Sequence, residues 1–227
     1  VIENTAKAVL DFQGEGLSIL EISHRAKYFQ PVVDEAEALM RELYQIPDNY
    51  KVLFIQGGAS AQFSAIPLNF MNGSGKADYV KTGQWSKKAI EEAQKYGDAK
   101  CIASSKDRTF AYIPTITPDM VREDADYVHV CYNNTIFGTK FPEVPNVGDK
   151  VLVADMSSCI LSEEVDVSKF GVIYAGAQKN IAPAGLTICI IREDLLGNAR
   201  DITPTMLNYE TMAGSGSMYN TPPAYGI

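Results

Sequence analysis

The segment 171-GVIYAGAQKNIAPAG-185 carries a lysine between two apolar runs. The first run, 172–175, ends in small residues, and the second, 186–191, begins soon after Lys179. Short apolar runs are typical of buried strands, and open α/β sheets bind their ligands where strands end. Lys179 is therefore a candidate for chemistry, although a surface lysine in a strand-to-strand loop would show the same local pattern.

A second apolar run ends in an acid, in 150-KVLVADMSS-158. Lys179 follows Asp155 by 24 residues (179 − 155), which is enough for a crossover between neighbouring parallel strands. Pyridoxal phosphate chemistry needs such a pair, because a lysine forms a Schiff base and a carboxylate contacts the pyridinium nitrogen. The pair indicates this chemistry as one candidate function.

Composition excludes some classes of partner. The chain has 227 residues, of which 46% are hydrophobic and 21% charged, as in an ordinary soluble globular protein. The net charge of −8 and the lack of a basic run argue against a nucleic-acid surface. No apolar stretch approaches the length of a membrane span, and no basic region precedes an apolar core at the N-terminus. We expect neither nucleic acid nor membrane as a partner.

Four cysteines lie far apart, in or beside apolar runs, at positions Cys101, Cys131, Cys159 and Cys189. Without CxxC spacing they predict buried thiols, not a zinc site or a disulfide framework. Free thiols are typical of a reducing compartment, so we expect a cytoplasmic protein. Metal-ligand spacing is missing elsewhere in the sequence, and we expect no metal site.

Helix and strand patterns alternate along the chain. Residues 27–46 repeat apolar side chains at three- and four-residue steps, with Pro31 in the first turn, which indicates an amphipathic helix. Further helices are predicted over 4–12, capped by Asn4 or Thr5, over 57–71, capped by Ser60, and over 86–97. Strands are predicted over 51–56, 77–82, 127–132, 151–155, 172–177 and 186–191. The alternation predicts a three-layer α/β/α domain over 1–227, with a mostly parallel sheet.

A Gly-rich turn, 57-GGAS-60, lies between a predicted strand and a predicted helix. Its backbone N–H groups and the helix dipole would form an anion site suited to a phosphate monoester. It has the spacing of neither a Walker loop nor a dinucleotide fingerprint. A simple tight turn explains the same residues.

Two further side chains follow predicted strands. Trp85, the only tryptophan, lies among polar residues in 81-KTGQWSKK-88, which favours an exposed or ligand-stacking indole. Thr135, in 132-YNNTIFG-138, could bond a ligand phenolate or only cap a turn. Both interpretations of each residue stay open on local grounds.

The two histidines differ in context. His129 alternates inside a predicted strand and is expected to be a core residue. His24, beside Arg25 in a loop, is a candidate for facing a ligand. No GxSxG turn supports a Ser-His-Asp triad.

The segment 212-MAGSGSMYNTPPAYG-226 is rich in Gly, Ser and Pro. Its simplest interpretation is a flexible linker that contributes almost nothing to a core.

Taken in chain order, these segments resemble the phosphoserine aminotransferase family, fold-type I pyridoxal phosphate enzymes of the class V branch. The matching segments are 23-SHR-25, 57-GGASAQF-63, 82-TGQWS-86, 133-NNTIFG-138, 154-ADMSS-158, 176-GAQKN-180 and 220-NTPP-223. They cover nearly the whole chain in the family's order.

The resemblance implies roles around the cofactor, pyridoxal 5′-phosphate. Lys179 would form the Schiff base and Asp155 would contact the pyridinium nitrogen. Trp85 would stack on the ring, and Thr135 would bond its phenolic oxygen. The phosphate would be held by Ala59, Ser60 and Gln178, joined by Asn220 and Thr221 from the other subunit of a homodimer.

The resemblance also implies how the substrate binds. His24 and Arg25 correspond to positions that help receive the substrate's anionic groups. Some relatives have arginine where Ser60 stands, so this part of substrate-phosphate recognition is expected to differ. Relatives also have an N-terminal segment and a small C-terminal domain, so we expect this chain to be the large domain of a longer enzyme.

The activity implied is transfer of the amino group between L-glutamate and 3-phosphooxypyruvate, giving 2-oxoglutarate and O-phospho-L-serine for serine biosynthesis. Whether phosphohydroxythreonine, of pyridoxine biosynthesis, is also a substrate stays open. An alanine–glyoxylate aminotransferase or a cysteine desulfurase would share the lysine–acid pair. A non-catalytic domain that binds a phosphorylated ligand is the remaining alternative.

Overall fold

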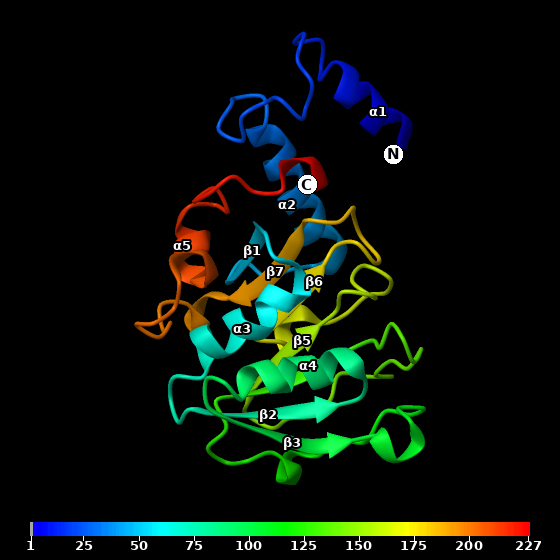
Figure 1. The fold of residues 1–227 in the computed structure, drawn as a ribbon, viewed down its shortest axis with the longest axis vertical. Coiled ribbons are helices and arrows are strands. Elements are labelled where there is room, and N and C mark those ends of the chain that lie inside the picture. Colours follow the sequence, from blue (N-terminus) through cyan, green and yellow to red (C-terminus); the bar gives the residue numbers. More distant parts are fainter. Residues whose placement is uncertain (1) are drawn as a thin grey trace.

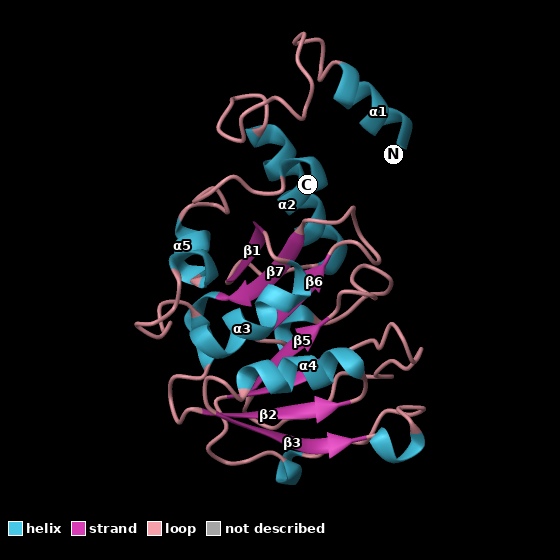
Figure 2. Ribbon diagram, viewed as in Figure 1, coloured by secondary structure: helices cyan, strands magenta, loops and turns pink. Residues whose placement is uncertain are grey.

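The structure, a computed structural model, describes residues 2–227 and contains one seven-stranded sheet (Figures 1 and 2). In chain order the strands are β1 (Tyr50–Ile55), β2 (Lys76–Lys81), β3 (Asp98–Ser104), β4 (Tyr127–Cys131), β5 (Val151–Asp155), β6 (Val172–Gly176) and β7 (Thr187–Arg192). Their order across the sheet is β1-β7-β6-β5-β4-β2-β3. Only β7 runs against its neighbours, since it pairs antiparallel with both β1 and β6. The mostly parallel sheet predicted from the sequence is confirmed.

Helices cover both faces of the sheet, as the alternating pattern predicts. The helices are α1 (Ile2–Leu10), α2 (Gln30–Tyr44), α3 (Gly58–Phe70), α4 (Gln84–Ala93) and α5 (Tyr209–Gly214). One buried cluster joins α2 to one face, and a second joins α3, α4 and α5 to the other. Because strand side chains alternate between faces, Ala154 belongs to the α2 cluster and Val153 to the other. Asp155, two residues after Val153, therefore lies on the α3 and α4 face.

The predicted N-caps of two helices, α1 and α3, are wrong. Helix α1 begins before Asn4 and Thr5, so neither residue is its cap. Helix α3 is preceded by Gly57 as N-cap, with a φ of 95° and no side-chain capping bond, so Ser60 is not the cap. Glycine adopts this left-handed conformation without the steric cost that a side chain would bring.

Strand β3 was not predicted from the sequence. It is an edge strand, paired with β2 alone, and Cys101 on it is exposed. The prediction of four buried thiols is therefore wrong for Cys101 and confirmed for Cys131, Cys159 and Cys189. A half-exposed edge strand lacks the continuous apolar run by which the other strands are recognised.

The C-terminal segment packs more than its composition predicts. Met212 and Ser217 are buried, and Ser217 Oγ accepts a 2.9 Å hydrogen bond from the backbone N–H of Phe54. The expectation of almost no core contribution over 212–226 is therefore wrong at these positions.

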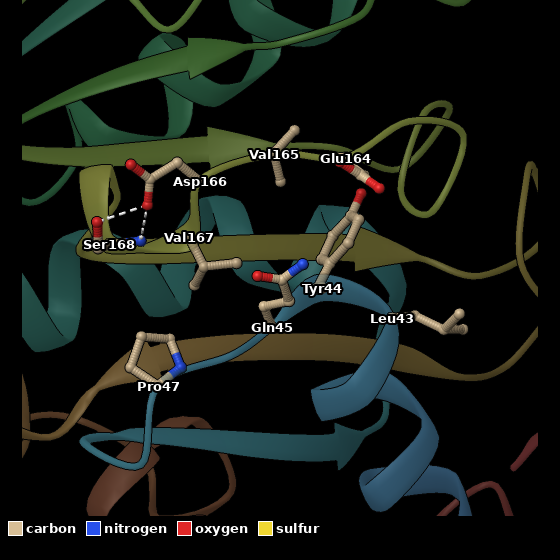
Figure 3. Close-up of a pocket in the computed structure, with 9 residues that line it drawn as sticks. All are labelled: Leu43, Tyr44, Gln45, Pro47, Glu164, Val165, Asp166, Val167 and Ser168. Carbon is tan, nitrogen blue, oxygen red and sulfur yellow. Dashed lines mark hydrogen bonds between the residues drawn. The ribbon is translucent and has the colours of Figure 1, made fainter.

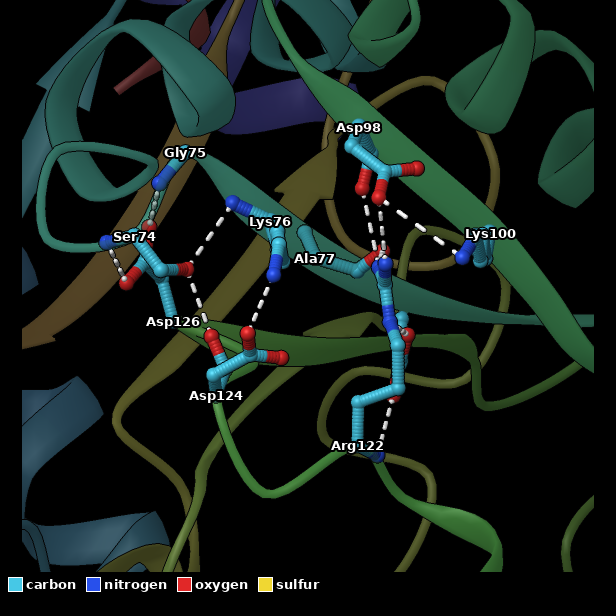
Figure 4. A network of polar contacts seen from close by, with 10 residues as sticks. Ser74, Gly75, Lys76, Ala77, Asp98, Lys100, Arg122, Asp124 and Asp126 are labelled. Atoms are coloured by element: carbon cyan, nitrogen blue, oxygen red, sulfur yellow. Dashed lines mark hydrogen bonds and ion pairs between the residues drawn. The ribbon is translucent and has the colours of Figure 1, made fainter.

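Two features occupy the amino-terminal edge of the sheet, away from the strand ends that follow Asp155 and Gly176. A polar network joins the first residues of β2 and β3 to the segment before β4 (Figure 4). A pocket of about 290 Å³ lies between the end of α2 and residues 164–168 (Figure 3). Neither lies at the carboxyl edge, where ligands bind in open α/β sheets.

Candidate active site

Lys179 lies in the loop that joins β6 to the antiparallel strand β7. A 2.9 Å hydrogen bond from the backbone N–H of Ala177 to the carbonyl of Leu186 closes this loop. Lys179 Nζ donates a 2.9 Å hydrogen bond to Thr135 Oγ1, and it lies 4.8 Å from the centroid of the Trp85 ring. The structure thus brings together three residues that follow three different strands.

Asp155 ends β5, which pairs in parallel with β6, as the spacing to Lys179 predicts. Its Oδ1 accepts hydrogen bonds from the backbone N–H of Ser157 at 2.9 Å and from Ser157 Oγ at 2.6 Å. Its Oδ2 has one weak contact, from Cys131 Sγ at 4.0 Å. Burial raises the pKa of the Asp155 carboxyl, and the Ser157 bonds and the Lys179 charge act in the opposite direction. One oxygen of a buried carboxylate is therefore left for a further donor.

Trp85 lies in the first turn of α4 and is partly buried. Two ammonium groups approach its ring, since Lys88 Nζ lies 4.9 Å from the centroid in addition to Lys179 Nζ. Cations are attracted to the negative face of an indole. Within residues 2–227, Trp85 Nε1 is buried without a hydrogen-bond partner.

The turn from Gly57 to Ser60 opens α3 at the same edge, because β1 runs parallel to β6 on the far side of β7. A Cβ added to Gly176 would lie 3.1 Å from Ala59 N and 3.3 Å from Gln178 Oε1. Ala59 and Gln178 therefore meet over the end of β6, and the first turn of α3 presents free N–H groups there. Ser60 is exposed in that turn.

The C-terminal loop reaches the same turn within one chain, since Gln56 Nε2 donates a hydrogen bond to the carbonyl oxygen of Thr221. Asn220 and Thr221 are exposed.

In the described chain, Lys179 Nζ bonds to Thr135, and no hydrogen bond joins it to His24 or Arg25. His24 is buried and its Nε2 has no partner within residues 2–227, whereas Arg25 is exposed. His129, as predicted, is a core residue whose Nε2 lies 2.8 Å from the Tyr174 hydroxyl.

Ser157 was missed as a site residue, although it stands in the quoted segment 154–158. The local signal was a hydroxyl two residues after an acid, a spacing that permits a side-chain turn. Asn134 Oδ1 accepts a 3.2 Å hydrogen bond from Thr82 Oγ1, which joins the segments that follow β4 and β2.

The described residues contain no group of three metal-ligating side chains close enough to hold an ion. Over the same part of the chain, no helix has the length and apolarity needed to cross a membrane.

Comparisons of sequence and of structure with known proteins find relatives of one kind, the aminotransferases. A sequence model of the family described as aminotransferase class-V matches residues 1–227. A phosphoserine aminotransferase of Bacillus thuringiensis subsp. konkukian (strain 97-27) is 57% identical over all of this chain. The chain spans 63% of that relative's length.

Solved structures agree over nearly the whole chain. Phosphoserine aminotransferase from Bacillus circulans subsp. alkalophilus matches with a TM-score of 0.93 and 43% identity, over 99% of this chain and 62% of that one. PLP-bound phosphoserine aminotransferase from Trichomonas vaginalis matches with a TM-score of 0.92 and 37% identity, over 99% of this chain and 67% of that one.

Proposed function

Because the chain belongs to the class V aminotransferase family, we propose that it is the cofactor-binding large domain, 1–227, of a pyridoxal phosphate-dependent phosphoserine aminotransferase. The proposed reaction moves the amino group between L-glutamate and 3-phosphooxypyruvate. The similarity to phosphoserine aminotransferases supports this choice of substrates. The observation that carries the proposal is the meeting of Lys179, Thr135 and Trp85 at the strand edge where Asp155 ends β5.

The donors and acceptors present fit pyridoxal phosphate. A buried carboxylate is costly unless a cationic or N–H donor pairs with it, and Asp155 Oδ2 offers that position to a protonated ring nitrogen. The indole of Trp85 offers a flat face beside Lys179 Nζ. The first turn of α3, at Ala59 and Ser60, would hold the phosphate together with Gln178.

When bound, pyridoxal phosphate supplies an aldehyde that takes up the amino group and a ring that accepts electrons from the substrate's α-carbon. Lys179 Nζ would hold the cofactor and, once freed, would remove a proton from the α-carbon and return it to the cofactor side as base and acid. The Thr135 hydroxyl orients Nζ for this transfer. The carboxylate of Asp155 would keep the ring nitrogen protonated, and Trp85 would shield one ring face from water.

His24 and Arg25 would receive the anionic groups of the substrate. The buried Nε2 of His24 supports this role, because an unbonded donor or acceptor in that position gains from a polar ligand. Ser60 offers only a neutral hydroxyl in the turn, so we propose that the exposed Arg25 supplies positive charge for the substrate's phosphate.

The other class V activities are less well supported. A cysteine desulfurase needs a mobile nucleophilic cysteine, and the exposed Cys101 lies on β3. Strands β4 and β2 separate β3 from Asp155 on β5. A non-catalytic phosphate-binding domain would not need the Lys179 ammonium group beside the Trp85 ring.

We place the protein in a reducing cytoplasm, because its four cysteines are free thiols. A second, phosphohydroxythreonine-consuming role in pyridoxine biosynthesis would use the same phosphate-recognising groups.

Borohydride reduction tests the proposed chemistry. Reduction should fix pyridoxal phosphate to one peptide, containing Lys179, and Lys179→Ala should lose both the label and transamination. Lys88 is the matched control, since its Nζ also lies within 5 Å of Trp85, at 4.9 Å, and Lys88→Ala should keep the label. A label on Lys88, or on any lysine other than Lys179, would overturn the assignment.

We also propose a homodimer in which Asn220 and Thr221 complete the phosphate site of the neighbouring subunit. Their exposed side chains are free to reach a second copy, while Gln56 holds the backbone at Thr221. Exposed apolar side chains on and near α1, such as Leu10 and Leu20, offer surface for such a contact.

Mixing two inactive variants separates action between subunits from action within one subunit. Lys179→Ala chains and Thr221→Ala chains are combined under conditions that exchange subunits, and pyridoxal phosphate affinity is measured. If the loop acts between subunits, each mixed dimer has one site with intact Lys179 and Thr221, and wild-type affinity returns there. If affinity does not rise above the Thr221→Ala baseline, the loop acts within its own chain, as the Gln56 contact would then explain.

A further inference from the structure

We infer that Ser157 is a positioning residue that holds Asp155 with one carboxylate oxygen free for the ring nitrogen of the cofactor. The inference deepens the proposed function and rests on it. Ser157 is buried, with 2% of its surface exposed, and it lies in the turn directly after β5.

The direction of the Ser157 hydroxyl follows from its partners. Ser157 Oγ accepts a 3.0 Å hydrogen bond from the backbone N–H of Gly176. A serine hydroxyl has a single proton, and since Oγ accepts from Gly176, Ser157 donates that proton in its 2.6 Å hydrogen bond to Asp155 Oδ1. The backbone N–H of Ser157 bonds to the same oxygen. Both donors therefore engage Oδ1, which leaves Oδ2 open.

A bare carboxylate could rotate and share its oxygens among several neighbours. The titratable groups around Asp155 are Lys179, Cys131 and Cys159, together with Tyr174 from the paired strand β6. Of these, only Cys131 makes a contact with the carboxylate close enough to compete, and it is weak. The two hydrogen bonds from Ser157, at 2.6 and 2.9 Å, thus fix the carboxylate's orientation before the cofactor arrives.

Gly176 connects this support to the phosphate end of the site. Its N–H donates to Ser157 Oγ, and a Cβ at Gly176 would lie within 3.3 Å of Ala59 N and Gln178 Oε1. The end of β6 therefore sets the separation between the group that would meet the ring nitrogen and the turn that would hold the phosphate. If the Ser157 hydrogen bonds only stabilised the turn after β5, their loss would not depend on whether a ligand has a ring nitrogen.

The test compares two ligands on the intact apoprotein. One is pyridoxal phosphate, and the other is its 1-deaza analogue, in which a C–H group replaces the ring nitrogen. Binding is followed by the fluorescence of Trp85, the only tryptophan. Ser157→Ala removes the charge-assisted hydrogen bond from the hydroxyl to Asp155. The variant should therefore bind pyridoxal phosphate about ten- to a hundredfold more weakly than wild type does. The analogue should bind Ser157→Ala and wild type alike.

Ser158→Ala is the matched control, because the Ser158 hydroxyl bonds to Asn133 and makes no bond to Asp155 in the described chain. It should bind both ligands as wild type does. Ser157→Cys keeps a similar size but donates only weakly, so it should repeat the selective loss if Ser157→Ala does not fold. Equal losses for both ligands, or no loss for either, would overturn the positioning role.

A measurement without cofactor separates this inference from the proposed function. In a double-mutant cycle on the unfolding of the apoprotein, Ser157→Ala and Asp155→Asn should be coupled by more than about fivefold in the unfolding equilibrium constant. Additive effects would show that Ser157 does not hold Asp155. If coupling is found but wild type binds no pyridoxal phosphate, the proposed function fails while the Ser157–Asp155 contact stands.

Discussion

Replacement of Asp78 by alanine tests what fixes the amino-terminal edge of the sheet. The Asp78 side chain is 0% exposed and accepts hydrogen bonds from the backbone N–H of Arg122 at 2.8 Å and from Arg122 Nε at 2.7 Å. Arg122 also donates to Asp98 Oδ2 at 2.7 Å and to the carbonyls of Ala77 and Asp98 at 2.8 Å (Figure 4). One guanidinium thus ties β2 to the edge strand β3.

The magnitude follows from what Asp78→Ala leaves behind. Removing one partner of a buried ion pair costs about 3–5 kcal/mol, because the other charge remains buried. Arg122 is 18% exposed and keeps Asp98, so we expect the lower end, a loss of about 3 kcal/mol in the free energy of unfolding. For a domain of this size, that loss corresponds to a fall in Tm of about 6–12 °C.

Thermal unfolding followed by circular dichroism measures the effect. The control is Asp124→Ala, which removes the ion pair with Lys76, where the two side chains are 54% and 38% exposed. Exposed pairs contribute little, so this variant should melt close to wild type. If Asp78→Ala melts no lower than Asp124→Ala, the Arg122 network does not hold this edge as reasoned.

Two further predictions concern the site edge and the core. Gly176→Ala would bring a Cβ to 3.1 Å from Ala59 N, so it should weaken binding of both inorganic phosphate and pyridoxal phosphate. Unchanged affinity for both ligands would show that the turn does not close on a phosphate. Burial lowers the pKa of His129 to about 3, so between that pH and about 6.5 the unfolded chain binds one more proton. Stability should fall as pH falls, by up to about 1.4 kcal/mol per pH unit, and His129→Gln should flatten this dependence in urea titrations. An equal slope in both proteins would contradict a buried neutral ring.

The sheet was predictable because six of its strands are short apolar runs at the expected spacing. Strand β3 escaped because an edge strand mixes exposed and buried positions, as the exposed Cys101 shows. Connections also differed from the regular alternation, since no α-helix occurs between β4 and β6 in the described chain. The only helical element there is the short 3-10 turn Val167–Lys169.

The site was predictable where strand ends alone decide the position. Trp85, Thr135 and Lys179 each follow a strand, and parallel strands end at one edge, so their meeting follows from topology. The role of Ser157 was not predictable, because it depends on the N–H of Gly176 approaching from a neighbouring strand. Sequence spacing shows that a hydroxyl follows an acid, but it does not show which oxygen the hydroxyl holds.

The antiparallel strand β7 explains why Lys179 is fixed and not merely near the site. If the strand after β6 in the chain ran parallel to it, a long crossover would be needed, and Lys179 would lie at the start of that connection. Instead β7 returns at once, the Ala177–Leu186 bond closes the loop, and Asn180 Nδ2 donates a 2.7 Å hydrogen bond to the carbonyl of Ile160. With the backbone held on both sides, Lys179 would need only side-chain rotations to move between Thr135 and the substrate's α-carbon in the proposed mechanism. A base that changes partners during a reaction gains from this arrangement, because the proton moves while the backbone that aims it stays in place.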